Sequence, residues 1–244
     1  MGKSGRTAIV TGSSRGIGKA VVERLARDGF SVVVNYSGNA IEAEKTVAGI
    51  KAGGGNAIAV KADVGDELEV SAMFDAAEAA FGGIDVVVSC AGIMALSPVA
   101  EMKLDDLDRM HRINIRGTFI VNQQAARRVR KGGAIVNIST SAEKQAIPGY
   151  AAYAASKGAV EAIGMILARE LRGRDITVNT VAPGPTATEL FFEGKDEAMI
   201  ERLAKLNPME RIGKPEEIAE VIAFLAGPSR WINGQVIYAN GGMN

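Results

Sequence analysis

A tyrosine and a lysine four residues apart carry the clearest chemical signal in the sequence, in the run Tyr153-Ala154-Ala155-Ser156-Lys157. Residues four apart share a helix face, so the phenol and the ammonium would point the same way. A free tyrosine has a pKa near 10 and is a poor acid at neutral pH. An ammonium about 4 Å away contributes roughly 4 kcal/mol at an effective dielectric of 20, which would lower the pKa of the phenol by up to about 3. The pair could therefore act in general acid–base catalysis.

The surroundings of this pair favour a functional interpretation over a chance spacing. Small residues dominate the same stretch, which would let a ligand and a neighbouring helix approach closely: Ala151, Ala152, Ala154, Ala155, Gly158 and Ala159. Just upstream, the hydroxyl residues Ser139, Thr140 and Ser141 end a run of strand-forming residues. Any of these hydroxyls could donate a hydrogen bond to a substrate carbonyl.

A glycine-rich turn near the N-terminus predicts a pyrophosphate site. Gly12, Gly16 and Gly18 lie between a predicted strand and a predicted helix. They would allow a tight turn and a close approach of the backbone to phosphate, and the helix N-terminus adds free N–H donors. Within the turn, Arg15 supplies a guanidinium suited to phosphate, although it could also be only a surface charge.

The second predicted strand indicates which dinucleotide would bind. Sheets specific for NAD usually carry an acid after this strand, which binds the ribose 2′-hydroxyl. Here the strand ends in Asn35-Tyr36-Ser37, without an acid. A carboxylate would repel a 2′-phosphate, whereas a serine hydroxyl would accept it, so the sequence predicts NADPH as the cofactor.

Short β-branched runs alternate with longer helical patterns along the whole chain. Most runs are apolar on both faces, as expected for parallel strands covered on both sides. We expect strands at 7–11, 31–35, 57–61, 86–89, 134–139, 177–182 and 235–238, and helices at 18–28, 40–52, 67–81, 104–130, 151–171 and 215–226. The alternation predicts a doubly wound (Rossmann) α/β fold with a seven-stranded parallel sheet, which binds ligands at the carboxyl ends of its strands.

Composition sets the broad class of protein. The 244 residues suit a single domain, 1–244, and the 47% hydrophobic content allows a sizeable core. The 28 basic and 28 acidic residues cancel, which argues against a nucleic-acid or membrane-surface binder. Cys90 is the only cysteine, so an intrachain disulfide is excluded, and no cluster has metal-ligand spacing. No secretory signal or membrane span is evident, so we expect a cytoplasmic protein.

These motifs, in this order, resemble the classical short-chain dehydrogenase/reductase family. The G-x-x-x-G-x-G turn and the Tyr-x-x-x-Lys pair occur at the family's intervals, and the resemblance covers Thr7 to Gly242. It implies that Tyr153 is the proton donor and that Lys157 binds the ribose and lowers the phenol pKa. It also places Thr140 where most members have the serine that binds the substrate carbonyl. Asn114 matches the family asparagine that kinks its helix and extends a proton relay through water.

The resemblance further implies contacts along the whole cofactor. Asp63 would bind the adenine amino group, although read alone it could equally cap the next helix. Thr186 would hold the nicotinamide carboxamide through its backbone, and Thr188 would contact the same half through its hydroxyl. The expected cofactor-binding residues are Gly12, Ser14, Arg15, Gly16, Ile17, Gly18, Asn35, Tyr36, Ser37, Asp63, Val64, Ser89, Ala91, Gly92, Tyr153, Lys157, Pro183, Gly184, Thr186 and Thr188.

The fourth predicted strand departs from the family pattern. Members usually read Asn-Asn-Ala-Gly, and this chain has Ser89-Cys90-Ala91-Gly92. The Ala-Gly pair that lets adenosine lie close is kept, while the asparagines that brace the sheet are lost. We expect Cys90 to be a small packed residue rather than a reactive thiol. His111, the only histidine, is likewise expected to be structural.

Residues 189–212 form a long excursion after the sixth strand, and we expect them to be a substrate lid. Its apolar residues, Phe191, Phe192, Met199, Leu203 and Leu206, would cover the substrate or belong to the core. The resemblance is nearest to the 3-oxoacyl-acyl-carrier-protein reductases and the NADPH-dependent carbonyl reductases. It implies an NADPH-dependent ketone or aldehyde reductase that acts on a small-molecule carbonyl and forms a homotetramer.

Two other functions remain as alternatives. One is a 3-oxoacyl-thioester reductase of fatty-acid synthesis, in which basic residues near Arg130 and Arg174 would meet an acidic carrier protein. The other is a catalytically silent nucleotide-binding regulator, against which the intact Tyr153 and Lys157 argue.

Overall fold

One parallel sheet organises the protein. The structure, a computed structural model, describes residues 5–244, so the first four residues of the expected domain lie outside the described residues. The strands lie in the order β3-β2-β1-β4-β5-β6-β7, and every pairing is parallel. Their bounds are β1 Thr7–Val10, β2 Ser31–Tyr36, β3 Asn56–Lys61, β4 Ile84–Ser89, β5 Val129–Ile138, β6 Thr177–Pro183 and β7 Val236–Ala239. The predicted doubly wound fold is confirmed.

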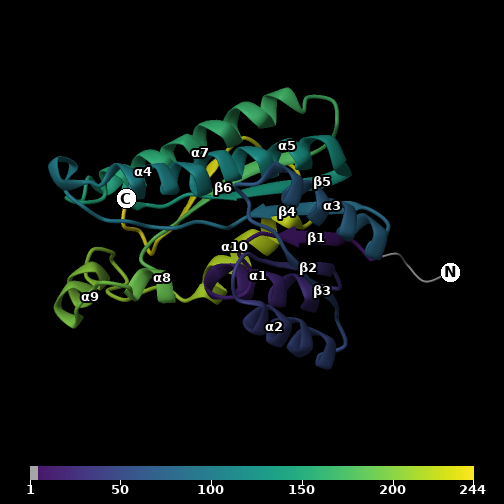
Figure 1. Ribbon diagram of the computed structural model, residues 1–244, viewed down its shortest axis with the longest axis horizontal. Coiled ribbons are helices and arrows are strands. Elements are labelled where there is room, and N and C mark those ends of the chain that lie inside the picture. The colour runs from purple at the N-terminus through teal and green to yellow at the C-terminus, as the bar shows by residue number, and fades with distance from the viewer. Residues whose placement is uncertain (1–4) are drawn as a thin grey trace.

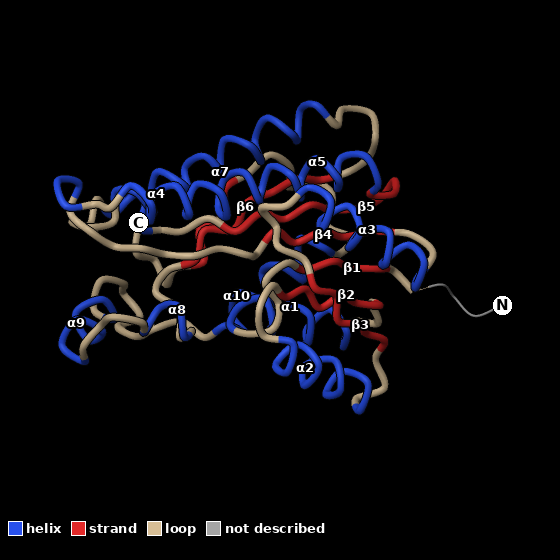
Figure 2. Tube along the Cα trace, in the orientation of Figure 1, coloured by secondary structure: helices blue, strands red, loops and turns tan. Residues whose placement is uncertain are grey.

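Helices cover both faces of this sheet (Figures 1 and 2). On one face, α1 (Gly16–Arg27), α2 (Ala40–Ala52) and α10 (Pro215–Ala226) pack in a core with the alternate residues of the central strands. On the other face, α3 (Glu67–Phe81), α5 (Thr118–Arg128) and α7 (Ala151–Glu170) form a second core. The strands are buried on both sides for this reason, which explains their continuous apolar runs.

The order of the strands changes direction at β1: β2 and β3 follow on one side of it, and β4 to β7 follow on the other. Val10 lies in register with Val34 of β2 on one side and Val88 of β4 on the other. The chain therefore leaves β1, β2 and β4 at the same edge of the sheet, in a crevice where open α/β sheets bind ligands.

The region expected to be one helix at 104–130 is divided into three parts. It contains α4 (Leu104–Met110), a π-helical segment η2 (His111–Gly117) and α5, and the chain then enters β5 at Val129, earlier than expected. Four short helices were not predicted: η1 (Val99–Glu101), α6 (Ala142–Gln145), α8 (Glu189–Phe192) and α9 (Glu197–Ala204). Within residues 5–244, no helix combines the length and the apolar character needed to span a bilayer.

Candidate active site

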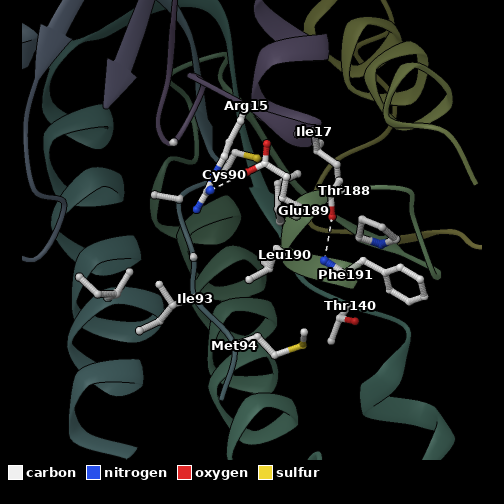
Figure 3. A pocket seen from close by; sticks show the side chains of 18 of the residues that line it. Arg15, Ile17, Cys90, Ile93, Met94, Thr140, Thr188, Glu189, Leu190 and Phe191 are labelled. Carbon is white, nitrogen blue, oxygen red and sulfur yellow. Dashed lines mark hydrogen bonds and ion pairs between the residues drawn. The ribbon is translucent and has the colours of Figure 1, made fainter. Parts of the chain in front are cut away.

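A cavity of about 770 Å³ opens at the carboxyl edge of the sheet, within the size range of cofactor and ligand sites. Its walls come from the glycine turn, the ends of β2, β4, β5 and β6, helix α7 and the lid residues 189–212. Figure 3 shows Arg15 and Ile17 of the turn near Thr188 and Glu189 at the start of the lid. Segments far apart in the sequence therefore build one site.

The glycine turn leaves room for a pyrophosphate only because its residues lack side chains. Gly12 and Gly16 have positive φ angles of 62° and 56°. A Cβ on Gly12 would lie 2.8 Å from the Cα of Ala91, and one on Gly18 would lie 2.5 Å from the carbonyl oxygen of Gly12. Helix α1 begins without a side-chain cap, so its first N–H groups face the cavity edge as free donors. This arrangement fits the phosphates of a dinucleotide.

The end of β2 has the uncharged character that the sequence predicted. Asn35 is buried and joins the turn to β3: its Oδ1 accepts from the Gly12 amide at 3.0 Å and its Nδ2 donates to the Ala62 carbonyl at 3.0 Å. Tyr36 and Ser37 line the cavity. The nearest lining carboxylate along the chain, Glu42, is paired with Lys45 at 2.8 Å. Its pKa is lowered by that hydrogen bond.

Asp63 lies at the cavity wall after β3, and it does not cap the next helix. Its Oδ1 accepts from the Gly65 amide at 2.8 Å, and its Oδ2 accepts from Arg112 at 2.9 Å. Helix α3 is capped instead by Asp66, which accepts from the amides of Leu68 and Glu69. The capping alternative for Asp63 is therefore wrong. Val64, Ala91 and Gly92 line the same cavity, whereas Ser89 is buried outside it.

Tyr153 and Lys157 both line the cavity from α7, and the Lys157 ammonium lies over the tyrosine ring. Burial raises the pKa of Tyr153 to about 12, and a hydrogen bond with Thr140 acts in the opposite direction. The Lys157 Nζ donates to the Ile138 carbonyl at 2.9 Å and lies 5.8 Å from the centre of the tyrosine ring. Burial lowers the pKa of Lys157 to about 8.

In this geometry burial dominates the pKa of Tyr153, and the expected effect of Lys157 on the phenol stays a prediction. Desolvation disfavours the charged form of each group and is the largest influence on both pKa values. The phenol carries its proton at neutral pH but is a weaker acid than free tyrosine, so its proton would be given up only as negative charge develops on the substrate oxygen.

The three hydroxyls after β5 have different surroundings. Ser139 also borders the cavity, but it is buried and its hydroxyl donates to Glu161 of α7 at 2.7 Å. The Ser141 Oγ lies 3.2 Å from the Ala182 carbonyl and accepts from Asn240 at 3.1 Å. Thr140 lines the cavity (Figure 3), where its hydroxyl accepts from the Ala142 amide at 3.2 Å and acts to lower the pKa of Tyr153. Of the three, Thr140 is best placed to reach a substrate carbonyl.

Replacing Thr140 by alanine should lower kcat by about tenfold to a hundredfold, since a hydrogen bond to a charged group is worth about 1.5–3 kcal/mol. Steady-state assays of Thr140→Ala and Ser141→Ala with one substrate will compare the two hydroxyls. If Ser141→Ala lost more activity than Thr140→Ala, the placement of Thr140 at the carbonyl would be wrong.

Asn114 lies behind the cavity wall rather than in it. Its side chain, in η2, accepts from the Ile93 amide and donates to the Ile93 carbonyl, both at 2.9 Å, and it also donates to Ser156 at 3.0 Å. These bonds fix the chain just after β4, where a Cβ on Gly92 would lie 3.3 Å from the Lys157 Nζ. Asn114 thus positions the part of the cavity wall that lies beside Lys157. The proton relay through Asn114 stays a prediction.

Four predicted residues from the end of β6 also lie at the cavity: Pro183, Gly184, Thr186 and Thr188. Gly184 is required by close packing, because a Cβ there would lie 2.8 Å from the Cα of Asn240. Thr188 accepts from the Phe191 amide at 3.1 Å and so caps α8, the first helix of the lid. The remaining predicted cofactor residues of the turn, Ser14 and Ile17, line the cavity as well.

The lid presents part of its apolar surface to the cavity. Phe191 and Leu203 line it, together with Leu190, whereas Phe192 and Leu206 are exposed by 41% and 43% and Met199 lies outside the lining. Sequence reasoning missed other apolar lining residues: Ile93, Met94, Ile147, Tyr150 and Met243. They lie in loops or next to them, and no periodic pattern marks them.

Cys90 lines the cavity without the properties of a nucleophile. Burial raises the pKa of its thiol to about 11, so the reactive thiolate is scarce at neutral pH. Within residues 5–244, no group of His, Cys, Asp and Glu side chains is arranged to hold a metal ion.

Comparison with known proteins agrees with this geometry. A family model described as enoyl-(acyl carrier protein) reductase matches residues 12–244. A short-chain type dehydrogenase/reductase of Picea abies is 45% identical over 98% of this chain and 92% of its own. A protein of Arabidopsis thaliana named NADPH-dependent aldehyde reductase-like protein, chloroplastic, is 41% identical over 98% and 94%. The solved structure of a short chain dehydrogenase from Burkholderia cenocepacia in complex with NADP superposes with a TM-score of 0.92 at 37% identity, covering 98% of both chains. Sequence, fold and site geometry together establish that the chain belongs to the short-chain dehydrogenase/reductase family.

Proposed function

We propose that this protein is an NADPH-dependent reductase that converts a ketone or aldehyde carbonyl to an alcohol. The observation that carries the proposal is geometric: Tyr153, Thr140 and Lys157 line the same cavity as the glycine turn, whose close backbone packing leaves room for a dinucleotide. The relatives named as NADPH-dependent aldehyde reductases and the neighbour in complex with NADP support the cofactor and the reaction.

Each residue of the site would have a separate role in carbonyl reduction. NADPH, when bound, supplies the hydride. Thr140 would donate a hydrogen bond to the carbonyl oxygen and so favour the negative charge that develops there. Tyr153 would then transfer its phenolic proton to that oxygen. Lys157 would hold the cofactor ribose, while Asn114 fixes the wall beside it.

NADPH rather than NADH is favoured by Arg15 and by the uncharged end of β2. In the purified protein, oxidation of NADPH by a panel of aldehydes, ketones and a 3-oxoacyl thioester should exceed oxidation of NADH. Ser37→Asp should weaken NADPH binding by about tenfold, because it places a like charge beside the 2′-phosphate. Equal or tighter binding of NADH by the unaltered protein would contradict the cofactor, and no turnover with any carbonyl would favour the silent regulator.

The acyl-carrier alternative has less support from the geometry. Arg130 lies near the amino-terminal end of β5, and it pairs with Asp85 of β4. Arg174 donates to backbone carbonyls of Ala126 and Val129. Both arginines are therefore engaged within the chain, at the edge of the sheet opposite the cavity. Preferential turnover of the acyl thioester in the panel would nevertheless establish that alternative.

We also propose a cytoplasmic homotetramer. Helices α5 and α7 leave large apolar side chains exposed, with Phe119 at 57%, Met165 at 46% and Ile166 at 57%. Such a surface is typical of an interface. Light scattering at micromolar concentration should give four times the 25.5 kDa chain mass. Ile166→Asp should shift the protein to smaller species, and a monomer in the unaltered protein would contradict the proposal.

A further inference from the structure

An ion pair joins the glycine turn to the lid across the edge of the cavity. The Arg15 Nη1 lies 2.6 Å from the Glu189 Oε2, and both residues line the cavity (Figure 3). Their side chains are 66% and 72% exposed, so each is free to take another partner. The guanidinium that is suited to a 2′-phosphate is thus already occupied by a carboxylate from 174 residues further along the chain.

The backbone around this pair fixes where Glu189 stands. Thr188 caps α8, which sets Glu189 at the first position of that helix. Thr188 also lies against the turn, because a Cβ on Gly16 would be 3.3 Å from its side-chain methyl group. The beginning of the lid therefore rests on the turn, and the Arg15–Glu189 pair is the charged contact between them.

No other charge of the turn or of the end of β2 can replace Arg15. Residues 35–39 are uncharged, and Arg15 is the charged residue of the turn 12–18. The other cations that line the cavity lie on other elements: Lys157 on α7 donates to Ile138, Arg112 in η2 donates to Asp63, and Arg109 lies on α4. A 2′-phosphate carries more negative charge than a carboxylate and offers more acceptor oxygens for a guanidinium. It is therefore a direct competitor of Glu189.

We propose that Glu189 is a specificity-determining residue, which competes with the 2′-phosphate of the cofactor for Arg15, so that phosphate binding releases the lid from the turn. The inference rests on the proposed use of NADPH. Glu189 reduces the preference in affinity for a ribose that carries the 2′-phosphate. The same ion pair holds the start of α8 to the turn until the phosphorylated cofactor binds.

The test uses two ligands that differ only in the 2′-phosphate, adenosine 2′,5′-bisphosphate and adenosine 5′-monophosphate. Calorimetry on the full chain gives the ratio of their dissociation constants. Glu189→Gln should increase the preference for the bisphosphate by about two- to fivefold, the range expected for loss of an exposed ion pair. In an Arg15→Ala background the same substitution should have no effect on the ratio, since the two residues act as one unit.

Glu220→Gln is the matched control. Glu220 forms an exposed pair of similar length, 2.7 Å, with Arg24 of α1, and it does not line the cavity. This variant should leave the ratio unchanged. Hydrogen exchange adds a readout of the lid: the bisphosphate, and not the monophosphate, should speed exchange of the α8 amides in the unaltered protein.

The outcomes separate the inference from the function. If the unaltered protein prefers the bisphosphate but Glu189→Gln leaves the ratio unchanged, the role of Glu189 is wrong and NADPH use stands. If the unaltered protein shows no preference, the proposed cofactor fails and the inference fails with it. Equal effects of Glu189→Gln and Glu220→Gln would also overturn the role of Glu189.

Discussion

Tyr153→Phe should lower kcat for carbonyl reduction by about 10²–10⁴-fold, the usual contribution of general acid catalysis. The substitution removes one hydroxyl and little volume, so the fold and NADPH binding should survive. Among the side chains that line the cavity, the Tyr153 phenol is the proton-bearing group that lies beside Thr140. Burial raises its pKa to about 12, so its proton should move only as negative charge develops on the substrate oxygen.

Single-turnover kinetics with a good substrate, with the hydride step shown to limit the rate, will measure this effect. Tyr150→Phe is a suitable control, because it removes a hydroxyl from a ring only 6.5 Å away that lines the same cavity. It should keep most of the activity. If Tyr153→Phe retained more than about a tenth of the unaltered rate, outside the range for a lost general acid, Tyr153 would not be the proton donor.

Lys157→Met should have two effects of opposite sign, a loss of activity and a gain in stability. Turnover and cofactor affinity should both fall, because the ammonium is expected to hold the ribose. The fold should gain about 1–3 kcal/mol at pH 7, since a lysine whose pKa is lowered from 10.5 to about 8 is costly to keep charged. Urea unfolding of the two proteins will measure the difference.

The difference in stability between Lys157→Met and the unaltered protein should depend on pH. Between about pH 8 and 10.5 the unfolded chain binds more protons at Lys157 than the folded one, so the stability of the unaltered protein rises with pH in that window. Lys157→Met lacks this rise of stability with pH. The amount by which its free energy of unfolding exceeds that of the unaltered protein should therefore be largest below pH 8 and should disappear near pH 10.5. Lys131→Met, at an exposed position on β5, should show neither effect. An equal stability of Lys157→Met and the unaltered protein at pH 7 would show that the buried ammonium is not costly.

Periodicity was sufficient to predict the sheet, because buried parallel strands and the helices that cover them carry distinct patterns. It could not predict α6 or α8, since each has only four residues and makes about one turn. Periodicity did not show the π-helical segment either, although the family resemblance implied a kink at Asn114. It coincides with Asn114, whose bonds go to Ile93 of another segment, so its geometry is tied to a tertiary contact rather than to local preference.

The residues of the site were largely identified by their spacing, whereas their electrostatics were not. Tyr153 and Lys157 are neighbours on α7 as expected, but their pKa values follow burial, which four-residue spacing does not reveal. Arg15 was expected to be available to phosphate. Its partner, Glu189, lies 174 residues away in a segment without a motif, and only the folded chain brings the two together.

Because of the π-helical segment, the structure of this region depends on the number of residues between α4 and α5. Each residue of an α-helix advances the rotation by about 100°, and a π-helix uses more residues for the same turn. Loss of one residue from His111–Gly117 would therefore restore the α-helical phase and rotate one side of the junction against the other. Asn114 would turn away from Ile93, or the apolar face of α5 would turn away from the sheet. A substitution in this segment keeps the helical phase, whereas a single deletion does not.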